Sequence, residues 1–467
     1  MVFSSNAFLF LFLPFVLLVY FNPFFTGRKF KNAFLLLASL FFYAWGEPVY
    51  WVILCISVCM NWLFGRLMTK REDERWEKRI EVIAIICNLS FLFVFKYMNF
   101  TVANLRRLNI SFPYSKIALP IGISFYTFQA ISYIVDIRRK KATAATSILD
   151  VGLGIACFPQ LLAGPIVRYS TIADEIHNRH ETLDDFCEGL TRFVYGLAKK
   201  VIIANNIAQV ADKAFSLPGQ SVSLAWMGAI AYTLQIYFDF SGYSDMAIGL
   251  GRIFGFHYLE NFNYPYISKS VTEFWHRWHI SLSTWFRDYV YFPLGGSRVK
   301  TAARHIFNLG VVWLLTGIWH GANWTFIMWG LVYFVVQIFE KYVLKAKAGS
   351  PVIGRIYTML VVVFCWVIFR SSSIRGAGLY LASMFGIGVT GTANSVAAGL
   401  MRDYWAYFVV GILASCPIAS VLKKHFLPAK GLTGGKVAYT VVTCAVFVLT
   451  ISFMVTSSYS PFIYFNF

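Results

Sequence analysis

The sequence predicts an all-α integral membrane protein that crosses the bilayer many times, and two observations predict it. Apolar residues make up 58% and charged residues 13% of the 467-residue chain, compared with roughly 45–50% and about 25% in an ordinary soluble domain. Uncharged stretches of about 20 residues, enough for a helix to cross a bilayer, recur without polar linkers between them. We therefore expect one membrane domain over residues 1–467, with roughly 11–13 membrane helices.

The expected spans of the first part of the chain alternate with basic loops. The first apolar run has no basic residue before it and no small-residue cleavage pattern after it. This favours a first span with an outside N-terminus over a removable signal peptide. The charged segment 70–81 is expected in the cytoplasm, whereas the basic loop 106–116 breaks the positive-inside pattern. The expected spans lie near 7–21, 33–45, 50–67, 80–98 and 119–136.

The second part of the chain begins with shorter apolar pieces. Those between 150 and 200 are too short to span and are typical of re-entrant or interfacial helices. Lysines in the segment 423–436 place the loop before the last span inside, and therefore the C-terminal tail outside. The later spans are expected near 201–215, 225–256, 306–319, 324–339, 356–369, 404–421 and 437–456.

The net charge of +19 does not indicate nucleic-acid binding. In a membrane protein, basic residues beside the spans set the topology and contact anionic lipid headgroups. A cytoplasmic basic surface also suits an anionic ligand such as coenzyme A. The eight cysteines are scattered and include no CxxC pair, so we expect them to pack as small apolar side chains and predict neither disulfides nor a zinc site.

Ionisable residues within membrane segments are costly and usually line a cavity or pathway, and three clusters of them occur here. The first reads YFDFSGYSD over 237–245. On a helix, Ser241 and Asp245 share a face and Asp239 points elsewhere, while Gly242 permits a break. The cluster is either a polar kink that neighbouring helices satisfy or the lining of a solvent-filled site.

The second cluster reads FWHRWHISLSTWFRDYVY over 274–291 and is predicted as one amphipathic helix. At 100° per residue, its polar stripe holds His276, His279, Ser283 and Arg287. Its apolar stripe contains Trp275, Trp278, Leu282, Trp285 and Tyr289. Either this is an interfacial helix anchored by tryptophans or its polar face is catalytic. A metal site is disfavoured because no nearby Cys or carboxylate completes a ligand set.

The third cluster reads GIWHGANW over 317–324, and His320 is its one ionisable residue. A lone histidine with apolar neighbours is more often structural than catalytic. Within a membrane, however, even a neutral imidazole needs polar partners, and His279 of the second cluster is a candidate. Histidine is also the usual general base for a hydroxyl acceptor, because its unperturbed pKa is near 6.5.

With these motifs in place, the chain resembles the membrane-bound O-acyltransferase family. The resemblance lies with the branch that contains the alginate O-acetyltransferase membrane subunit and its peptidoglycan-acetylating relatives. It covers nearly the whole chain and includes the three clusters above. It also includes MVFSSNAFLFLFLP, LPIGISFYTFQAISYIVD (119–136), FPQLLAGPIVRY (158–169) and the final SYSPFIYFNF. The family fold implies a ring of membrane helices around a thinned centre, with a tunnel from a cytoplasmic acyl-CoA site to the opposite side.

The resemblance also implies a reaction and its residues. His320 matches the family's catalytic histidine, the general base on the acceptor hydroxyl, and His279 matches a second polar catalytic position. His279 would orient His320 or donate to the oxyanion. Acetyl-CoA would be the co-substrate, with no metal, and the candidates for its phosphates are Arg277, Arg287 and Arg298. The expected setting is a bacterial inner membrane, with membrane lipid, an esterase-like extracytoplasmic partner and a polysaccharide acceptor: alginate, peptidoglycan or another exopolysaccharide.

The tail 457–467 is aromatic, uncharged and rich in hydroxyls. It resembles the acyl-accepting tail of the small protein paired with the teichoic acid D-alanylation enzyme, and Tyr464 is then the expected acetyl carrier. The alternative is an aromatic anchor at the membrane interface.

Two other functions stay open. A transporter or channel could carry a solute past the same buried His and Asp residues, and within the family the donor could be a D-alanyl carrier protein.

Overall fold

The chain is folded into helices joined by turns and loops. The computed structural model describes residues 1–110, 113–217, 219, 221–344, 350–418, 420–421, 433–456, 459, 461 and 463. None of these residues lies in a β-strand, which confirms the all-α class. The chain divides into two compact units, Met1–Phe193 with Ser244–Leu259 and Val194–Tyr243 with Glu260–Phe467.

Six helical stretches among the described residues are long and apolar enough to cross a membrane. Large apolar side chains on them face outward, for example Leu63 at 51% exposure and Val448 at 68%. Such surfaces need hydrocarbon rather than water around them, so the polytopic membrane character is confirmed. The six stretches are Trp51–Met68, Glu74–Arg107, Trp324–Leu344, Pro351–Arg370, Ser395–Ala414 and Gly435–Thr456.

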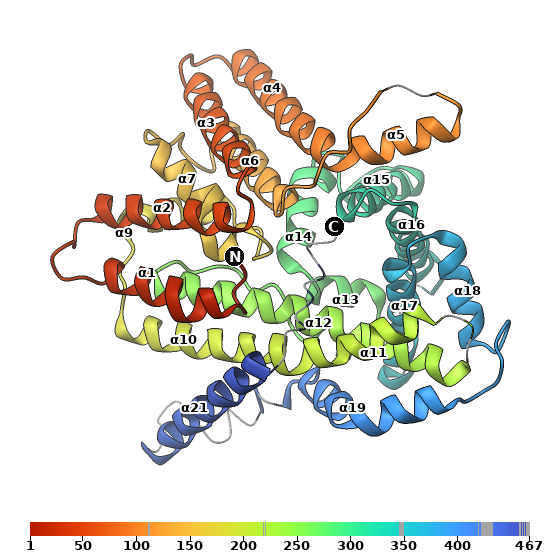
Figure 1. The fold of residues 1–467 in the computed structure, drawn as a ribbon. Helices are drawn as coiled ribbons and strands as arrows, with labels where there is room; N and C mark the ends of the chain where they lie inside the picture. The colour runs from red at the N-terminus through yellow and green to blue at the C-terminus, as the bar shows by residue number, and fades with distance from the viewer. Residues whose placement is uncertain are drawn as a thin grey trace. The chain divides into compact units, whose positions relative to one another are not determined.

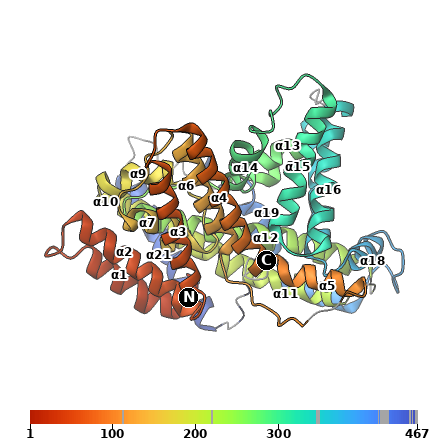
Figure 2. The same cartoon turned by 90° about the horizontal axis from the view of Figure 1, so that it is seen from above.

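The first unit is built around a buried helix, α6 (Ile123–Arg138), whose residues from Ile123 to Ile137 are all buried. Helices α3 and α4 pack on α6 and lie side by side in both views (Figures 1 and 2). They are joined by reciprocal hydrogen bonds between the buried amides of Asn61 and Asn88. The helices of the first unit are η1 (Phe8–Phe12), α1 (Leu13–Tyr20), α2 (Arg28–Gly46), α3 (Trp51–Met68), α4 (Glu74–Leu92), η2 (Phe93–Tyr97), α5 (Met98–Arg107), α6, α7 (Ile148–Ala156), α8 (Phe158–Leu161), α9 (Tyr169–Asn178) and most of α10 (Leu183–Ala198).

Helices α7, α8 and α9 are the short pieces expected between residues 150 and 200.

The second unit carries the three polar clusters, apart from the last residues of the first one. Its helices are η3 (Lys199–Ala204), α11 (Asn205–Ser216), α12 (Val222–Ile253, shared with the first unit), η4 (Pro265–Ile267), α13 (Val271–Arg277), α14 (Ile280–Phe286), η5 (Arg287–Tyr291), α15 (Ala302–His320), α16 (Trp324–Ile338), η6 (Phe339–Leu344), α17 (Pro351–Arg370), α18 (Ile374–Met384), α19 (Ser395–Ala414) and α21 (Thr433–Thr456).

Helices α15 and α16 form a closely packed hairpin (Figures 1 and 2), and α16 also packs on α17 (Figure 1). Glycines make the close approach possible. A Cβ atom on Gly317 would lie 2.6 Å from the carbonyl oxygen of Phe326, and one on Gly330 would lie 2.5 Å from that of Trp313. Small residues at a helix crossing are the usual means of close packing in membranes. The hairpin fixes His320, the last residue of α15.

A carboxylate distant in sequence caps helix α13. Both oxygens of Glu340 in η6 accept hydrogen bonds at the start of α13: one from the Val271 amide (2.6 Å), the other from the Thr272 amide (3.0 Å) and the Thr272 hydroxyl (2.7 Å). A negative charge at a helix N-terminus satisfies free amides and interacts favourably with the helix dipole. Glu340 therefore ties α13, which leads into His279, to the end of the α15–α16 hairpin.

Replacing Glu340 by alanine is expected to destabilise the protein by about 2–4 kcal/mol, because buried amides lose charge-assisted hydrogen bonds. The measurement is the thermal unfolding midpoint of the detergent-purified chain. Glu340→Gln, which keeps one acceptor oxygen, is the matched control and should lose less. Equal midpoints for wild type and Glu340→Ala would contradict this account of the cap.

Candidate active site

His320 sits in an aromatic cage. Its imidazole is 4% exposed, and its ring lies edge-to-face against Trp329 and Phe369, with centroids 4.9 and 5.2 Å away. The neighbouring Trp319 ring adds a third wall at 5.1 Å. Such perpendicular contacts are favourable and hold a ring in one orientation. The cage therefore fixes the imidazole and limits its access to water.

Gly321, directly after His320, is required by close packing. A Cβ atom at this position would lie 2.3 Å from the Phe326 ring. Asn323 then caps α16, with its side-chain oxygen 3.2 Å from the Thr325 amide. The sequence WHGAN thus ends one helix, turns and starts the next within four residues after the histidine.

His279 is also buried, at 1% exposure, and its backbone is unusual. Its φ of +45° and ψ of +54° lie in the left-handed region, which costs a non-glycine residue about 1–3 kcal/mol. Contacts with Asn261 compensate this cost. The Ile280 amide donates to the Asn261 carbonyl (3.0 Å), and the Asn261 side-chain oxygen accepts from the Ser281 amide (3.2 Å) and hydroxyl (2.9 Å).

The same Asn261 oxygen lies 3.2 Å from Nδ1 of His279. An amide oxygen only accepts hydrogen bonds, so Nδ1 carries a proton, and in the neutral ring Nε2 then holds the lone pair. The imidazole packs edge-to-face on Phe240, with centroids 4.6 Å apart. His279 is therefore held as a fixed base rather than as a mobile side chain.

Trp319 links the two histidines. Its indole contacts the His279 ring at 6.0 Å and the His320 ring at 5.1 Å between centroids. The second and third clusters of the sequence thus meet around one tryptophan within the second unit.

The prediction of one continuous helix over 274–291 is wrong. Helix α13 ends at Arg277, the left-handed His279 breaks the path, α14 begins at Ile280, and η5 follows from Arg287. His276 and His279 consequently do not share a face, since His276 is exposed and His279 is buried. The physical reason is the set of Asn261 hydrogen bonds, which fixes the break and cannot be read from helical periodicity.

A cavity of about 650 Å³ runs alongside α15, within the size range of small-molecule sites. Its lining on α15 extends from His305 to Thr316, about 16 Å at 1.5 Å per residue. Thr316 lies one turn before His320. The cavity therefore leads from the start of α15 to within one helical turn of the caged imidazole.

One end of this cavity is basic. His276, Arg287 and Lys341 contribute to the lining, together with His305. The Lys341 ammonium lies 3.1 Å from Nε2 of His305, and Tyr342 lies 2.9 Å from its Nδ1. Burial and the Lys341 charge lower the pKa of His305, which favours its neutral imidazole. Arg287 forms an ion pair with Asp288 (2.8 Å).

Of the three arginines predicted to bind the coenzyme, Arg287 alone lines the cavity. Arg277 pairs with Glu273 (2.9 Å) and donates to the Asn263 carbonyl (3.1 Å), and Arg298 is exposed. Sequence reasoning missed Lys341 and His305. Their signal was weak: both are ordinary-looking polar residues at the ends of apolar helices, and only the fold brings them together.

The aspartates of the first cluster are both ion-paired. Within the second unit, Asp239 pairs with Lys200 (2.5 Å), and within the first, Asp245 pairs with Arg192 (2.8 Å). The chain does not break at Gly242, where a break was considered permissible, because α12 is continuous from Val222 to Ile253. Gly242 serves close packing instead, since a Cβ atom there would lie 2.7 Å from the carbonyl oxygen of Gly196.

Tyr464, the predicted acetyl carrier, lies outside the described residues. Within the described parts of the chain, no group of three or more His, Cys, Asp or Glu residues could hold a metal ion.

Comparison with known proteins agrees with the sequence motifs. A sequence model described as "MBOAT, membrane-bound O-acyltransferase family" matches residues 40–380. The probable alginate O-acetylase AlgI of Pseudomonas putida is 40% identical over 100% of both chains. That of Pseudomonas aeruginosa is 45% identical over 83% of this chain and 75% of its own. The peptidoglycan O-acetyltransferase of Helicobacter pylori is 34% identical over 83% of this chain and 80% of its own.

Proposed function

Because this chain belongs to the membrane-bound O-acyltransferase family, we propose that it moves acetyl groups from cytoplasmic acetyl-CoA across the membrane for O-acetylation of an extracytoplasmic polysaccharide. One observation carries the proposal: the caged His320 lies one helical turn beyond Thr316, the last α15 residue in the lining of a cavity whose other end is basic. An anionic thioester donor fits such a cavity, with its phosphates at the basic end and its acyl group at the imidazole.

The chemistry follows from the two histidines. An acceptor hydroxyl gives its proton to His320 as its oxygen attacks the thioester carbonyl carbon. The carbon–sulfur bond then breaks, and the proton passes to the departing thiolate, which gives an acetyl ester and free coenzyme A. His279 acts beside it with its lone pair on Nε2. In this tautomer Nε2 of His279 accepts a hydrogen bond and does not donate one. We therefore favour a role in which His279 orients His320 and shares its proton, and not one in which His279 donates to the oxyanion.

The donor enters from the cytoplasm in this proposal. Arg298, Lys300 and Arg304 are exposed near the start of α15, and basic residues beside spans favour the cytoplasmic face. The protein would then be a multi-pass protein of a bacterial inner membrane. The sequence-based topology places both termini outside.

The relatives named for alginate and peptidoglycan acetylation support a polysaccharide acceptor. Acetyl reaches that polymer through an extracytoplasmic, esterase-like partner protein in our proposal. The hydroxyl of Tyr464 first accepts the acetyl group as an ester and then passes it on. Mass spectrometry of the 457–467 peptide after incubation with acetyl-CoA tests this step. An unmodified Tyr464 would exclude it as the acetyl carrier.

The cavity assignment makes a kinetic prediction. Arg287→Ala and Lys341→Ala should each raise KM for acetyl-CoA about tenfold or more, because a lost charge-assisted contact to phosphate is worth about 1.5–3 kcal/mol. The value of kcat should stay within about twofold, since the phosphates are bound equally in the ground and transition states. Initial rates of thiol release against acetyl-CoA concentration give both values.

Arg277→Ala is the matched control, because the Arg277 guanidinium pairs with Glu273 and is not part of the cavity lining. Its KM should stay at the wild-type value. A raised KM in Arg277→Ala, together with an unchanged KM in Lys341→Ala, would show that acetyl-CoA binds outside this cavity.

A further inference from the structure

Lys200 and Asp239 form a buried ion pair that the chemistry above does not use. Lys200 lies on η3, which continues α10, and Asp239 lies on α12. Their charged atoms are 2.5 Å apart, and their side chains are 3% and 2% exposed. Removing two charges from solvent is costly, and their attraction compensates it only where further hydrogen bonds complete the pair. The atoms that complete this one come from the segment after α21.

Both charged groups hold the main chain of that segment. The Lys200 ammonium donates to the Pro461 carbonyl, and the Ile463 amide donates to the second oxygen of Asp239 (2.8 Å). Charge-assisted hydrogen bonds of this kind are about twice as strong as neutral ones. Because they use backbone atoms, they hold the main chain at Pro461 and Ile463 independently of the side chains there.

A second ion pair holds the same segment two residues earlier. Asp212 on α11 binds the Arg370 guanidinium with one oxygen and accepts from the Tyr459 hydroxyl with the other. Arg370 ends α17 and directly follows Phe369. Two acid–base pairs therefore hold residues 459, 461 and 463 at three points.

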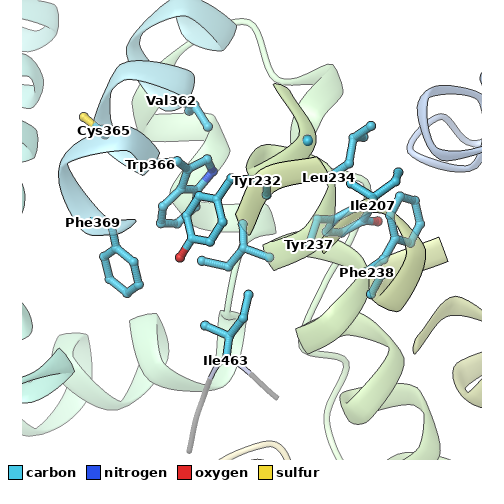
Figure 3. Packing of buried hydrophobic residues seen from close by; sticks show 14 of the residues in the cluster. Ile207, Tyr232, Leu234, Tyr237, Phe238, Val362, Cys365, Trp366, Phe369 and Ile463 are labelled. Atoms are coloured by element: carbon cyan, nitrogen blue, oxygen red, sulfur yellow. The ribbon is translucent and has the colours of Figure 1, made fainter. Parts of the chain in front are cut away.

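The held segment lies in the core that supports His320. Ile463 is 7% exposed and belongs to the same buried cluster as Tyr232, Trp366 and Phe369 (Figure 3). Phe369 in turn forms one wall of the His320 cage. Ile463 thus shares a buried cluster with Phe369, one wall of the cage around the proposed catalytic imidazole, all within the second unit.

From this geometry we propose that Lys200 and Asp239 are positioning residues that hold Pro461 and Ile463 in the cluster that contains the Phe369 wall of the His320 cage, so that acetyl passes to its acceptor and not to water. The inference rests on the proposed function. Without these contacts Ile463 leaves the cluster that supports Phe369, the site opens to solvent, and the thioester is hydrolysed without transfer. The Lys200–Asp239 pair is needed to couple thioester cleavage to acetyl transfer onto the acceptor, and it is not needed for thioester cleavage itself.

The position of the segment can be read directly. In a full-length chain whose native cysteines are replaced by serine, Ile463→Cys introduces one thiol at a buried position. Adding Lys200→Met with Asp239→Leu removes both backbone contacts and leaves no unpaired charge in the core. A hydrophilic maleimide should then label the thiol at least about tenfold faster in detergent. A tenfold rise in the population of the state in which the thiol is accessible corresponds to a free-energy change of about 1.4 kcal/mol.

Asp185→Asn is the matched control, because Asp185 pairs with Arg252 (2.9 Å) between α10 and α12 within the first unit. Labelling should stay slow in this variant. The conservative variants Lys200→Arg and Asp239→Glu should restore slow labelling at least in part. Equal labelling rates in the double variant and in the control would overturn the proposal.

The functional arm uses acetyl-CoA and compares free thiol released with acetyl transferred to acceptor. The double variant should release thiol at near the wild-type rate and transfer several-fold less acetyl, whereas a general folding defect would lower both together. If His320→Gln released thiol at the wild-type rate, that result would refute the proposed function and not this inference. Fast labelling without any loss of coupling would show that the pair anchors the segment but does not govern transfer, which would also overturn the inference.

Discussion

Replacing His320 by glutamine is expected to lower the rate of acetyl transfer about 10³-fold. General base catalysis by a positioned imidazole contributes typically about 10²- to 10⁴-fold. Glutamine is close to histidine in volume, so the contacts with Trp329 and Phe369 stay filled. The measurement is the initial rate of acetyl transfer by the purified chain at saturating acetyl-CoA, together with its thermal midpoint.

His180→Ala serves as the control for this result, since His180 is an exposed histidine of the first unit. It should keep both the wild-type rate and the wild-type midpoint. A His320→Gln chain that folds normally and retains more than about a tenth of the rate would exclude His320 as the general base.

Removing the His279 imidazole is expected to cost about 10²-fold in kcat. Glycine is the informative replacement, because the left-handed backbone at this position is strained for alanine but not for glycine. His279→Gly therefore removes the base and keeps the backbone path, whereas His279→Ala also disturbs α14. Added imidazole should restore part of the His279→Gly rate if the ring acts chemically.

Asn261→Leu tests the support of that ring. It removes the oxygen that accepts from Nδ1 of His279 and from Ser281, so the imidazole loses its fixed tautomer. We expect about a tenfold loss of kcat, smaller than for His279→Gly. If Asn261→Leu lowered the rate more than His279→Gly does, Asn261 would have a role of its own in the reaction.

The three polar clusters show what sequence reasoning could and could not reach. Charge within apolar runs drew attention to His279, His320 and Asp239, because ionisable groups in a membrane need a reason to be there. The structure places all three in the interior, and the catalytic roles of the histidines stay predictions. Helical periodicity then failed at 274–291. It assumes a continuous helix, and the break at His279 is imposed by Asn261 from a loop nearly twenty residues earlier.

Glycines were misread for a related reason. Gly242 was expected to permit a break, since glycine lacks a Cβ and is conformationally free. In α12 the missing Cβ instead lets the Gly196 carbonyl approach. A single sequence does not distinguish the two uses, because the approaching backbone belongs to another helix.

The basic end of the cavity was beyond sequence reasoning as well. Arg287 was identified as part of a conspicuous motif, but His305 lies near the start of α15 and Lys341 follows the end of α16, 36 residues later. Their nearness depends on how that hairpin closes at Gly317 and Gly330. The ring and central tunnel that the resemblance implies stay predictions.

The central claim is that a thioester is cleaved at an imidazole reached through the basic cavity. The most direct measurement supplies acetyl-CoA to the purified chain in sealed proteoliposomes of known orientation and follows free coenzyme A thiol. Thiol should appear when acetyl-CoA is on the membrane face that bears Lys341, which we propose is the cytoplasmic face, and not when it is on the opposite face. No thiol from either face, together with passage of a solute through the same liposomes, would contradict the account and indicate a transporter.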